Sequence, residues 1–253
     1  MIRYHDLPGA GPAVVLIHGL GAASSSDMMG MAGYPPLARR RRLLVDLLGF
    51  GYSDRPFTCR YRLVDHARSV GAVLDAAGAS GSQIIGHSMG GTVGITLAAL
   101  RPDLVSALVI AEGNLDPGVG TGSVEIAAWS EADFVARGHA FLLGRLLAEA
   151  RSGDPAVGVY AAAFRLAAPH AIHRSAVGLL ARTRATARES LYRFPGPRAF
   201  VFGARSLPDA DQEVLPQHGV EVLVVPDAGH AMTVEAPAAF ARLVGGFLRR
   251  AGG

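Results

Sequence analysis

The pattern Gly86-His87-Ser88-Met89-Gly90 stands between an apolar, β-prone stretch and a helix-prone stretch from Thr92 to Leu100. A serine hydroxyl is a weak nucleophile at neutral pH. It becomes reactive when a sharp strand-to-helix turn exposes it to a base and to backbone N–H groups. The two glycines carry no Cβ atom, so strand and helix can close tightly around such a turn. The pattern therefore predicts that Ser88 is a nucleophile on a strand-to-helix turn.

Short apolar runs alternate with helix-like segments along the rest of the chain. Several runs are continuously apolar, which is typical of parallel strands covered by helices on both faces. The alternation predicts a doubly wound, mostly parallel α/β sheet. The expected strands are Ala13–His18, Arg42–Asp46, Gln83–Gly86, Ala107–Ala111, Arg198–Gly203 and Val220–Pro226. The expected helices are Leu63–Ala77, Gly91–Leu100 and Ala238–Arg250.

One long segment, from about Thr121 to Arg193, contains no strand candidate and is rich in alanine, leucine and arginine at helical spacing. We expect a helical lid over residues 116–194, inserted into an α/β core of residues 1–115 and 195–253. Open α/β sheets bind ligands at the carboxyl ends of their strands, and this insertion lies where it would cover those ends. The aromatic side chains of the insertion are expected mainly to pack inside it: Trp129, Phe134, Phe141, Tyr160 and Phe164.

A serine nucleophile needs a histidine within hydrogen-bond reach. His230 is the best candidate among the nine histidines, because it follows the last expected strand and so lies at the same sheet edge as Ser88. His18, at the end of the first strong strand, is expected to be structural. His87 adjoins Ser88 and is expected to point away from its face of the turn.

Two backbone N–H groups are candidates for stabilising the oxyanion that forms when an acyl group is attacked. The glycine after His18 lets the chain turn close to the site, so that the N–H of Leu20 is expected to point at the oxyanion. The N–H of Met89, directly after Ser88, is the second expected donor.

The bulk composition excludes several classes of protein. Half of the 253 residues are hydrophobic, enough for a large core, but no apolar run is long enough for a membrane span. The N-terminus lacks the pattern of a signal peptide, and a single cysteine, Cys59, excludes an intramolecular disulfide; both favour a cytoplasmic location. Arg39–Arg42 is the only tight basic run, and without interleaved aromatic residues we interpret it as the solvated end of a helix. We therefore expect no nucleic-acid partner.

Four motifs, in this order, resemble those of α/β-hydrolase fold serine hydrolases of the capped esterase and lactonase type. They are His18-Gly19, the loop Asp46–Ser53, Gly86–Gly91, and Gly229-His230 followed by Glu235-Ala236-Pro237. Together they span nearly the whole chain outside the insertion. The resemblance implies Ser88 as nucleophile, His230 as base, and Leu20 and Met89 as oxyanion donors.

The acid of the triad departs from the family's commonest pattern. The resemblance places an aspartate after the strand that follows the lid, but Ser206 stands there. Some relatives take the acid from the end of the preceding strand, where this chain has Glu112, and we favour Glu112. Asp209 and Asp211 remain alternatives through a shifted loop, and Asp116 is a further one.

These expectations together predict a serine hydrolase that cleaves a carboxylic ester, lactone or thioester of a small apolar substrate through an acyl-enzyme. They imply no metal and no organic cofactor. A carbon–carbon bond hydrolase is an alternative, because the loop Gly49–Ser53 resembles that group too. A ligand-binding signalling protein of the same fold with little turnover is another. The sequence leaves open whether the chain forms a homodimer.

Overall fold

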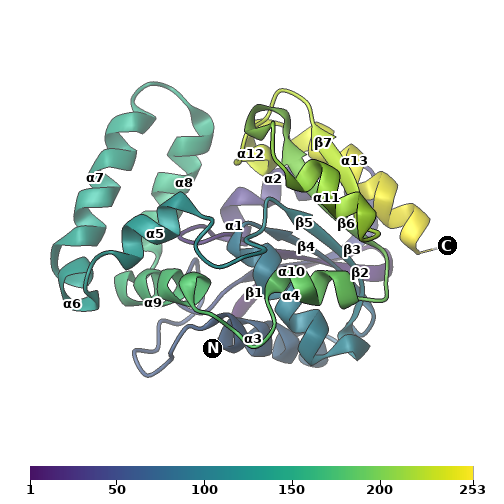
Figure 1. The fold of residues 1–253 in the computed structure, drawn as a ribbon, viewed down its shortest axis with the longest axis horizontal. Coiled ribbons are helices and arrows are strands. Elements are labelled where there is room, and N and C mark those ends of the chain that lie inside the picture. Colours follow the sequence, from purple (N-terminus) through teal and green to yellow (C-terminus); the bar gives the residue numbers. More distant parts are fainter. Residues whose placement is uncertain (253) are drawn as a thin grey trace.

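A computed structural model of the chain describes residues 1–252, and its centre is a seven-stranded sheet (Figure 1). The strands lie in the order β1-β3-β2-β4-β5-β6-β7. Only β1 is antiparallel to its neighbour, β3; the other pairs are parallel. The strands are β1 (Arg3–Leu7), β2 (Ala10–Ile17), β3 (Arg40–Asp46), β4 (Ser82–His87), β5 (Val105–Ala111), β6 (Arg198–Gly203) and β7 (Glu221–Val225).

Helices cover both faces of this sheet. The longer ones in the core are α3 (Leu63–Ala76), α4 (Met89–Leu100) and α13 (Pro237–Ala251). The shorter ones are α1 (Ser24–Asp27), α2 (Met29–Ala32), α11 (Asp211–Gln217), α12 (Met232–Glu235) and the turns η1 (Leu37–Arg39), η2 (Pro102–Leu104) and η4 (Ala204–Ser206). Within residues 1–252, no helix is both long and apolar enough to cross a membrane.

The sheet separates two hydrophobic clusters, and the strand residues alternate between them. Val15 and Ile17 of β2 pack into the cluster that contains α3 and α4, whereas Val14 and Leu16 pack into the cluster that contains α2 and α13. Because successive side chains of a strand point to opposite faces, a strand buried on both faces must be apolar throughout. This is the physical reason for the continuous apolar runs in the sequence.

The chain between β5 and β6 is helical, and the described residues contain no strand there. Its elements are α5 (Thr121–Ala127), α6 (Glu131–Asp133), η3 (Phe134–Gly138), α7 (His139–Ala150), α8 (Pro155–Leu166), α9 (Pro169–Leu180) and α10 (Ala187–Arg193). Helices α7 and α8 pack side by side at one end of the molecule, away from the sheet (Figure 1). The boundaries 116–194 of a separate lid stay a prediction.

The predicted α/β fold class is confirmed, and all six expected strands are present within a few residues of their expected ends. Strand β1 was missed. It pairs with β3 at the edge of the sheet, and the side chains of Arg3, Tyr4, His5 and Asp6 are exposed. An edge strand with both faces in solvent carries no hydrophobic pattern, so its sequence has no periodic signal.

The interpretation of Arg39–Arg42 as a solvated helix end was wrong for most of the run. Arg39 ends a short 3-10 turn, but Arg40 begins β3 and Arg42 is buried. The Arg42 guanidinium donates to the carbonyl oxygens of Arg40, Ala32 and Pro8. Five N–H donors in a fixed fork suit this role, since one side chain then satisfies carbonyls from several loops.

The tight turn at Ser88 yields a stability prediction. A Cβ atom on Gly90 would lie 2.1 Å from the Ile17 carbonyl oxygen, so Gly90→Ala must push α4 away from β2. We expect Gly90→Ala to lower the free energy of unfolding by about 1–3 kcal/mol or more. Gly144→Ala, in α7, is the matched control: its Cβ meets nothing within 4 Å. Alanine favours a helix interior by up to ~1 kcal/mol, so the control should be neutral or stabilising. Urea titrations of both variants measure the difference, and equal stabilities would contradict the close approach.

Candidate active site

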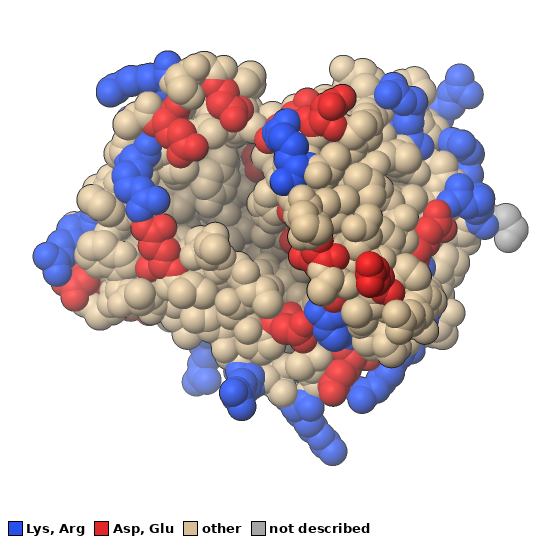
Figure 2. Space-filling model, turned by 45° about the horizontal axis from the view of Figure 1, so that its top comes forward, with Lys and Arg blue, Asp and Glu red and all other residues tan. Residues whose placement is uncertain are grey.

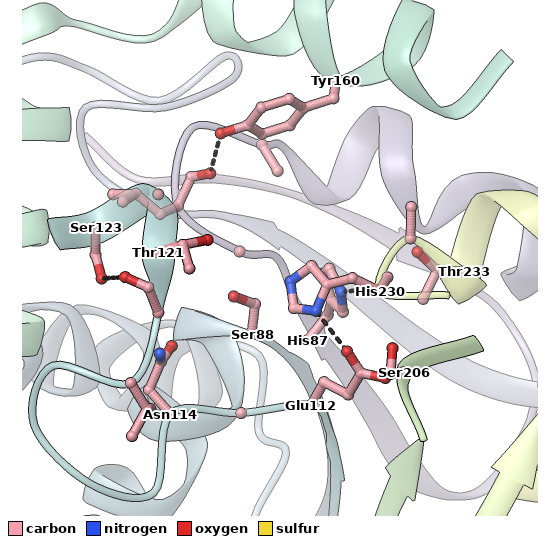
Figure 3. A pocket seen from close by; sticks show the side chains of 18 of the residues that line it. His87, Ser88, Glu112, Asn114, Thr121, Ser123, Tyr160, Ser206, His230 and Thr233 are labelled. Carbon is pink, nitrogen blue, oxygen red and sulfur yellow. Dashed lines mark hydrogen bonds and ion pairs between the residues drawn. The ribbon is translucent and has the colours of Figure 1, made fainter. Parts of the chain in front are cut away.

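Ser88 lies at the point where β4 turns into α4, with φ 52° and ψ −123°. This is a strained backbone for a residue with a side chain, typically costing about 1–3 kcal/mol, and such strain clusters at functional sites. The flanking glycines make the turn possible: a Cβ on Gly86 would lie 2.4 Å from the Gly90 carbonyl oxygen. The sequence-predicted turn is therefore present, with the serine at its tip (Figure 3).

His230 and Glu112 meet at the same edge of the sheet, although 118 positions separate them in sequence. His230 lies in the loop after β7, and Glu112 directly follows β5. The Nδ1 atom of His230 donates to Oε2 of Glu112 at 2.7 Å (Figure 3). A proton held on Nδ1 leaves Nε2 of the neutral ring as a proton acceptor, which is the tautomer that a general base requires.

The Glu112 carboxylate is held in place by several donors. Its Oε1 accepts from the Gly203 N–H at 2.9 Å. Burial acts to raise the pKa of Glu112, but hydrogen bonds from His230, the Gly203 amide and the Ser206 hydroxyl together hold that pKa below its ordinary value. The carboxylate is therefore ionised at neutral pH, and it can stabilise a positive charge on His230.

The alternative acids are engaged elsewhere. Asp211 and Asp116 both pair with the Arg188 guanidinium, each at 2.6 Å. Asp209 accepts from the backbone N–H of Asp211 at 2.8 Å, at the start of α11. Ser206, which occupies the acid position of the commonest family pattern, instead supports Glu112 from the next strand.

The two expected oxyanion donors flank Ser88. Met89 begins α4, where the first N–H groups of a helix have no partner within it. The loop that contains Leu20 passes close by, since a Cβ on Gly19 would lie 3.2 Å from the Cβ of Ser88. The Leu20 carbonyl accepts from the Tyr160 hydroxyl at 3.1 Å, which fixes the orientation of this loop. Their roles as oxyanion donors stay predictions.

His18 is structural, as the sequence suggested. It is fully buried: Nε2 accepts from the Leu47 N–H at 3.0 Å, and Nδ1 contacts the Gly19 carbonyl oxygen at 2.7 Å. A carbonyl only accepts and an N–H only donates, so Nδ1 carries the single proton and the ring is neutral. Burial lowers the pKa of His18, in line with this tautomer.

The prediction that His87 points away from the site was wrong. Its ring packs against the His230 ring, with centroids 4.7 Å apart, and its Nε2 lies 2.8 Å from the His230 carbonyl oxygen. The loop after β7 thus contacts the end of β4 through its His230. His87 therefore holds the backbone of His230.

A cavity of about 710 Å³ opens beside Ser88, and Glu112 and His230 line it too. Figure 2 shows the hollow in this face, with both acidic and basic side chains along its margin. Such a volume suits a small-molecule ligand. Tyr160 is the only one of the five singled-out aromatic residues of the insertion that lines the cavity; Phe134 and Phe164 are buried in the core.

Sequence reasoning missed several polar residues of the cavity wall: Asp27, Asn114, Thr121, Ser123 and Thr233. For Asp27 the available signal was its place shortly after His18-Gly19, and for Asn114 its place just after Glu112. Within residues 1–252, no group of three or more histidine, cysteine, aspartate or glutamate side chains is arranged to hold a metal ion.

The sequence of the chain matches a family model and, over part of its length, curated proteins. A family model described as alpha/beta hydrolase fold matches residues 12–237. A 2-hydroxymuconate semialdehyde hydrolase of Pseudomonas putida is 41% identical over 109 residues, which make up 42% of this chain and 37% of that protein. The chain thus spans less than two fifths of the length of this curated relative.

Solved structures resemble the chain over nearly its whole length. A thermophilic esterase of Thermogutta terrifontis has a TM-score of 0.82 at 21% identity, covering 100% of this chain and 94% of the esterase. An enol-lactonase of Burkholderia xenovorans has a TM-score of 0.81 at 20% identity, covering 98% of this chain and 96% of the lactonase. At these identities the likeness shows the fold.

The buried histidines predict how stability depends on pH. Burial lowers the pKa of His66 and of His87 to about 3, from an ordinary value of 6.5. Below about pH 6.5 these histidines bind protons in the unfolded chain but stay neutral in the folded chain. The free energy of unfolding therefore decreases as the pH is lowered. We expect a loss of roughly 1 kcal/mol per histidine between about pH 7.5 and about pH 5.5.

Urea titrations across this range measure the effect, and His66 gives the cleaner test because it lies outside the cavity, bonded to Ser175 at 2.9 Å. His66→Gln keeps an amide to bond that hydroxyl but cannot take up a proton. Its stability should change less with pH than that of the wild type. An unchanged pH dependence would show that His66 titrates normally in the folded protein.

Proposed function

The chain belongs to the α/β-hydrolase fold family, and on this premise we propose that it is a serine hydrolase that cleaves a carboxylic ester, lactone or thioester. The observation that carries the proposal is the 2.7 Å hydrogen bond from His230 to Glu112 beside a serine on a strained turn. A nucleophile, a base and an acid that orients the base are the parts that acyl transfer to water requires.

In the proposed reaction Ser88 Oγ attacks the acyl carbonyl while His230 Nε2 takes its proton. The N–H groups of Leu20 and Met89 stabilise the oxyanion, each contributing about 2.7–4 kcal/mol of barrier lowering. His230 then gives the proton to the leaving group as the acyl-enzyme forms. It next takes a proton from a water molecule that attacks the acyl carbon. The bond to Ser88 Oγ then breaks, His230 returns the proton to this oxygen, and the acid is released.

Glu112 acts throughout as the partner of the imidazolium. Its carboxylate fixes the tautomer of His230 and stabilises the positive charge that the ring carries after each proton transfer. The depressed pKa of Glu112 suits this role, because the carboxylate stays ionised at neutral pH.

Helices α5–α10 would act as the lid of this site. Side chains from α5 and α8, among them Ser123, Ile126 and Tyr160, line the cavity together with residues of the sheet edge. The insertion thus supplies much of the surface that a substrate meets, and we propose that it determines which acyl and alcohol groups fit.

A carbon–carbon bond hydrolase remains the second candidate, favoured by the identity to a 2-hydroxymuconate semialdehyde hydrolase. Muconate semialdehyde carries a carboxylate. The cation that lines the cavity here, Arg188, already binds Asp116 and Asp211. The charge of the cavity therefore favours ester, lactone or thioester cleavage over a dienoate substrate.

Hydrolysis of p-nitrophenyl butyrate tests the proposal. We expect turnover by the wild type, loss of turnover in Ser88→Ala, and a decrease in kcat of about 10³–10⁴-fold in Glu112→Gln, since an amide cannot stabilise the imidazolium. Asp209→Asn is the matched control, because it removes a carboxylate of the same cavity that does not contact His230, and it should keep near wild-type activity.

Other outcomes reassign the site. Full activity in Glu112→Gln would remove Glu112 from the triad, and loss of activity in Asp209→Asn would point to that aspartate. A wild type that turns over no ester but reacts with a fluorophosphonate probe at Ser88 would retain the nucleophile and reject the substrate. A wild type inert to both would favour a ligand-binding protein.

A further inference from the structure

Asp27 is a buried acid in the wall of the cavity. It ends α1, the short helix that follows the Leu20 loop, and only 8% of its surface is exposed. It lines the same cavity as Ser88, Leu20 and Tyr160. Aspartate is rarely this buried unless it is paired with a cation or bound to a metal, because removing a carboxylate from water is costly.

The partners that Asp27 has within the protein are neutral. Its Oδ1 accepts from the Ser26 hydroxyl at 2.7 Å. No cationic group of residues 1–252 forms an ion pair with it. His18 is near, but both of its ring nitrogens are engaged in the neutral form. Burial raises the pKa of Asp27, as expected of a carboxylate that lacks a countercharge.

The rest of the cavity adds negative charge. Eight aspartates and glutamates line it against one arginine, although the chain as a whole has more basic than acidic residues. That arginine, Arg188, is neutralised by Asp116 and Asp211. A cleft lined by one sign of charge concentrates ligands of the opposite sign. Glu235 pairs with Arg205, and Glu112 pairs with His230. The lining acids that form no ion pair among the described residues still leave the cavity net negative, which favours cations over carboxylates: Asp27, Glu149, Asp154 and Asp209.

Tyr160 lies on the lid side of the cavity, above the Leu20 loop (Figure 3). Asp27 and Tyr160 line the same cavity from α1 and α8, two helices that pack against each other. Burial and then the charge of Asp27 raise the pKa of the Tyr160 hydroxyl, in line with this arrangement. A carboxylate beside an aromatic ring is a combination that binds ammonium groups, through charge and through the face of the ring.

We propose that the substrate of this cavity carries an ammonium group, which Asp27 binds while Ser88 attacks the acyl carbon. The inference rests on the proposed hydrolase function and narrows it to an ester or lactone whose apolar chain ends in a cation. Asp27 then supplies the binding charge, and the substrate supplies the countercharge that the protein lacks.

Three p-nitrophenyl esters with the same three-methylene spacer test the proposal: the 4-(trimethylammonio)butyrate, its uncharged isostere the 5,5-dimethylhexanoate, and the anionic hemiglutarate. We expect the wild type to show a kcat/KM for the cationic ester at least about tenfold above that for the isostere, because only the quaternary ammonium is attracted by the charge of the carboxylate. The anionic ester should be the poorest substrate. Equal values for the cationic ester and its isostere would overturn the proposal.

Asp27→Asn assigns the preference to this residue. It should remove most of the preference for the cationic ester while leaving the rate on the neutral isostere within a few-fold of wild type. Glu149→Gln is the control, since it removes an exposed carboxylate from the same cavity. The control should keep the preference; if both variants lose it equally, the field of the whole cavity is responsible and Asp27 is not.

Binding to the Ser88→Ala protein separates this inference from the proposed function. Calorimetry with the same three esters needs no turnover. Tighter binding of the cationic ester by about tenfold, without turnover by the wild type, would retain the cation site and reject the hydrolase. Turnover of the neutral ester by the wild type, with no charge preference in rate or binding, would retain the hydrolase and reject the cation site.

Discussion

The close approach of α4 to the end of β2 is the constraint on which the site depends. Gly90 lies so near the Ile17 carbonyl oxygen that no side chain fits between them, and Gly86 lies equally near the first turn of the helix. This contact brings the strained Ser88, the Leu20 loop and the helix N-terminus together in one place. Glu112 and His230 only have to reach the edge of the sheet at that point, and they follow β5 and β7, which end there.

The acid of the proposed triad can come from either of two neighbouring strands without a change in the geometry of the sheet. Strands β5 and β6 are parallel neighbours, so their carboxyl ends lie side by side. An acidic side chain on either end can reach the loop that carries His230. Here Glu112, directly after β5, makes the contact with His230. Ser206, after β6, lines the same cavity and acts to lower the pKa of Glu112. The proposed triad keeps its chemistry because only the strand of origin has changed.

Much of this arrangement could be predicted from the sequence, since it depends on local patterns. The continuous apolar runs predicted the parallel strands, and places at or after strand ends predicted Ser88 and His230. Glu112 was favoured because some relatives of the resembled family take their acid from that strand, with Asp209 and Asp211 left as alternatives. Strand β1 was missed because both of its faces are exposed. His87 was misplaced because its surroundings are set by a loop 143 positions away. The burial of Asp27 likewise depends on α8, which packs over α1 and belongs to the inserted segment.

The bond between His87 and His230 has a mechanical consequence. His87 is covalently next to Ser88, and its ring donates to the main chain of His230 at 2.8 Å. Because burial keeps this ring neutral, its single proton stays on the nitrogen that makes the bond. This bond links the turn that carries the serine to the loop that carries the histidine. A displacement of the loop after β7 would therefore act, through this one contact, on the residue next to the proposed nucleophile.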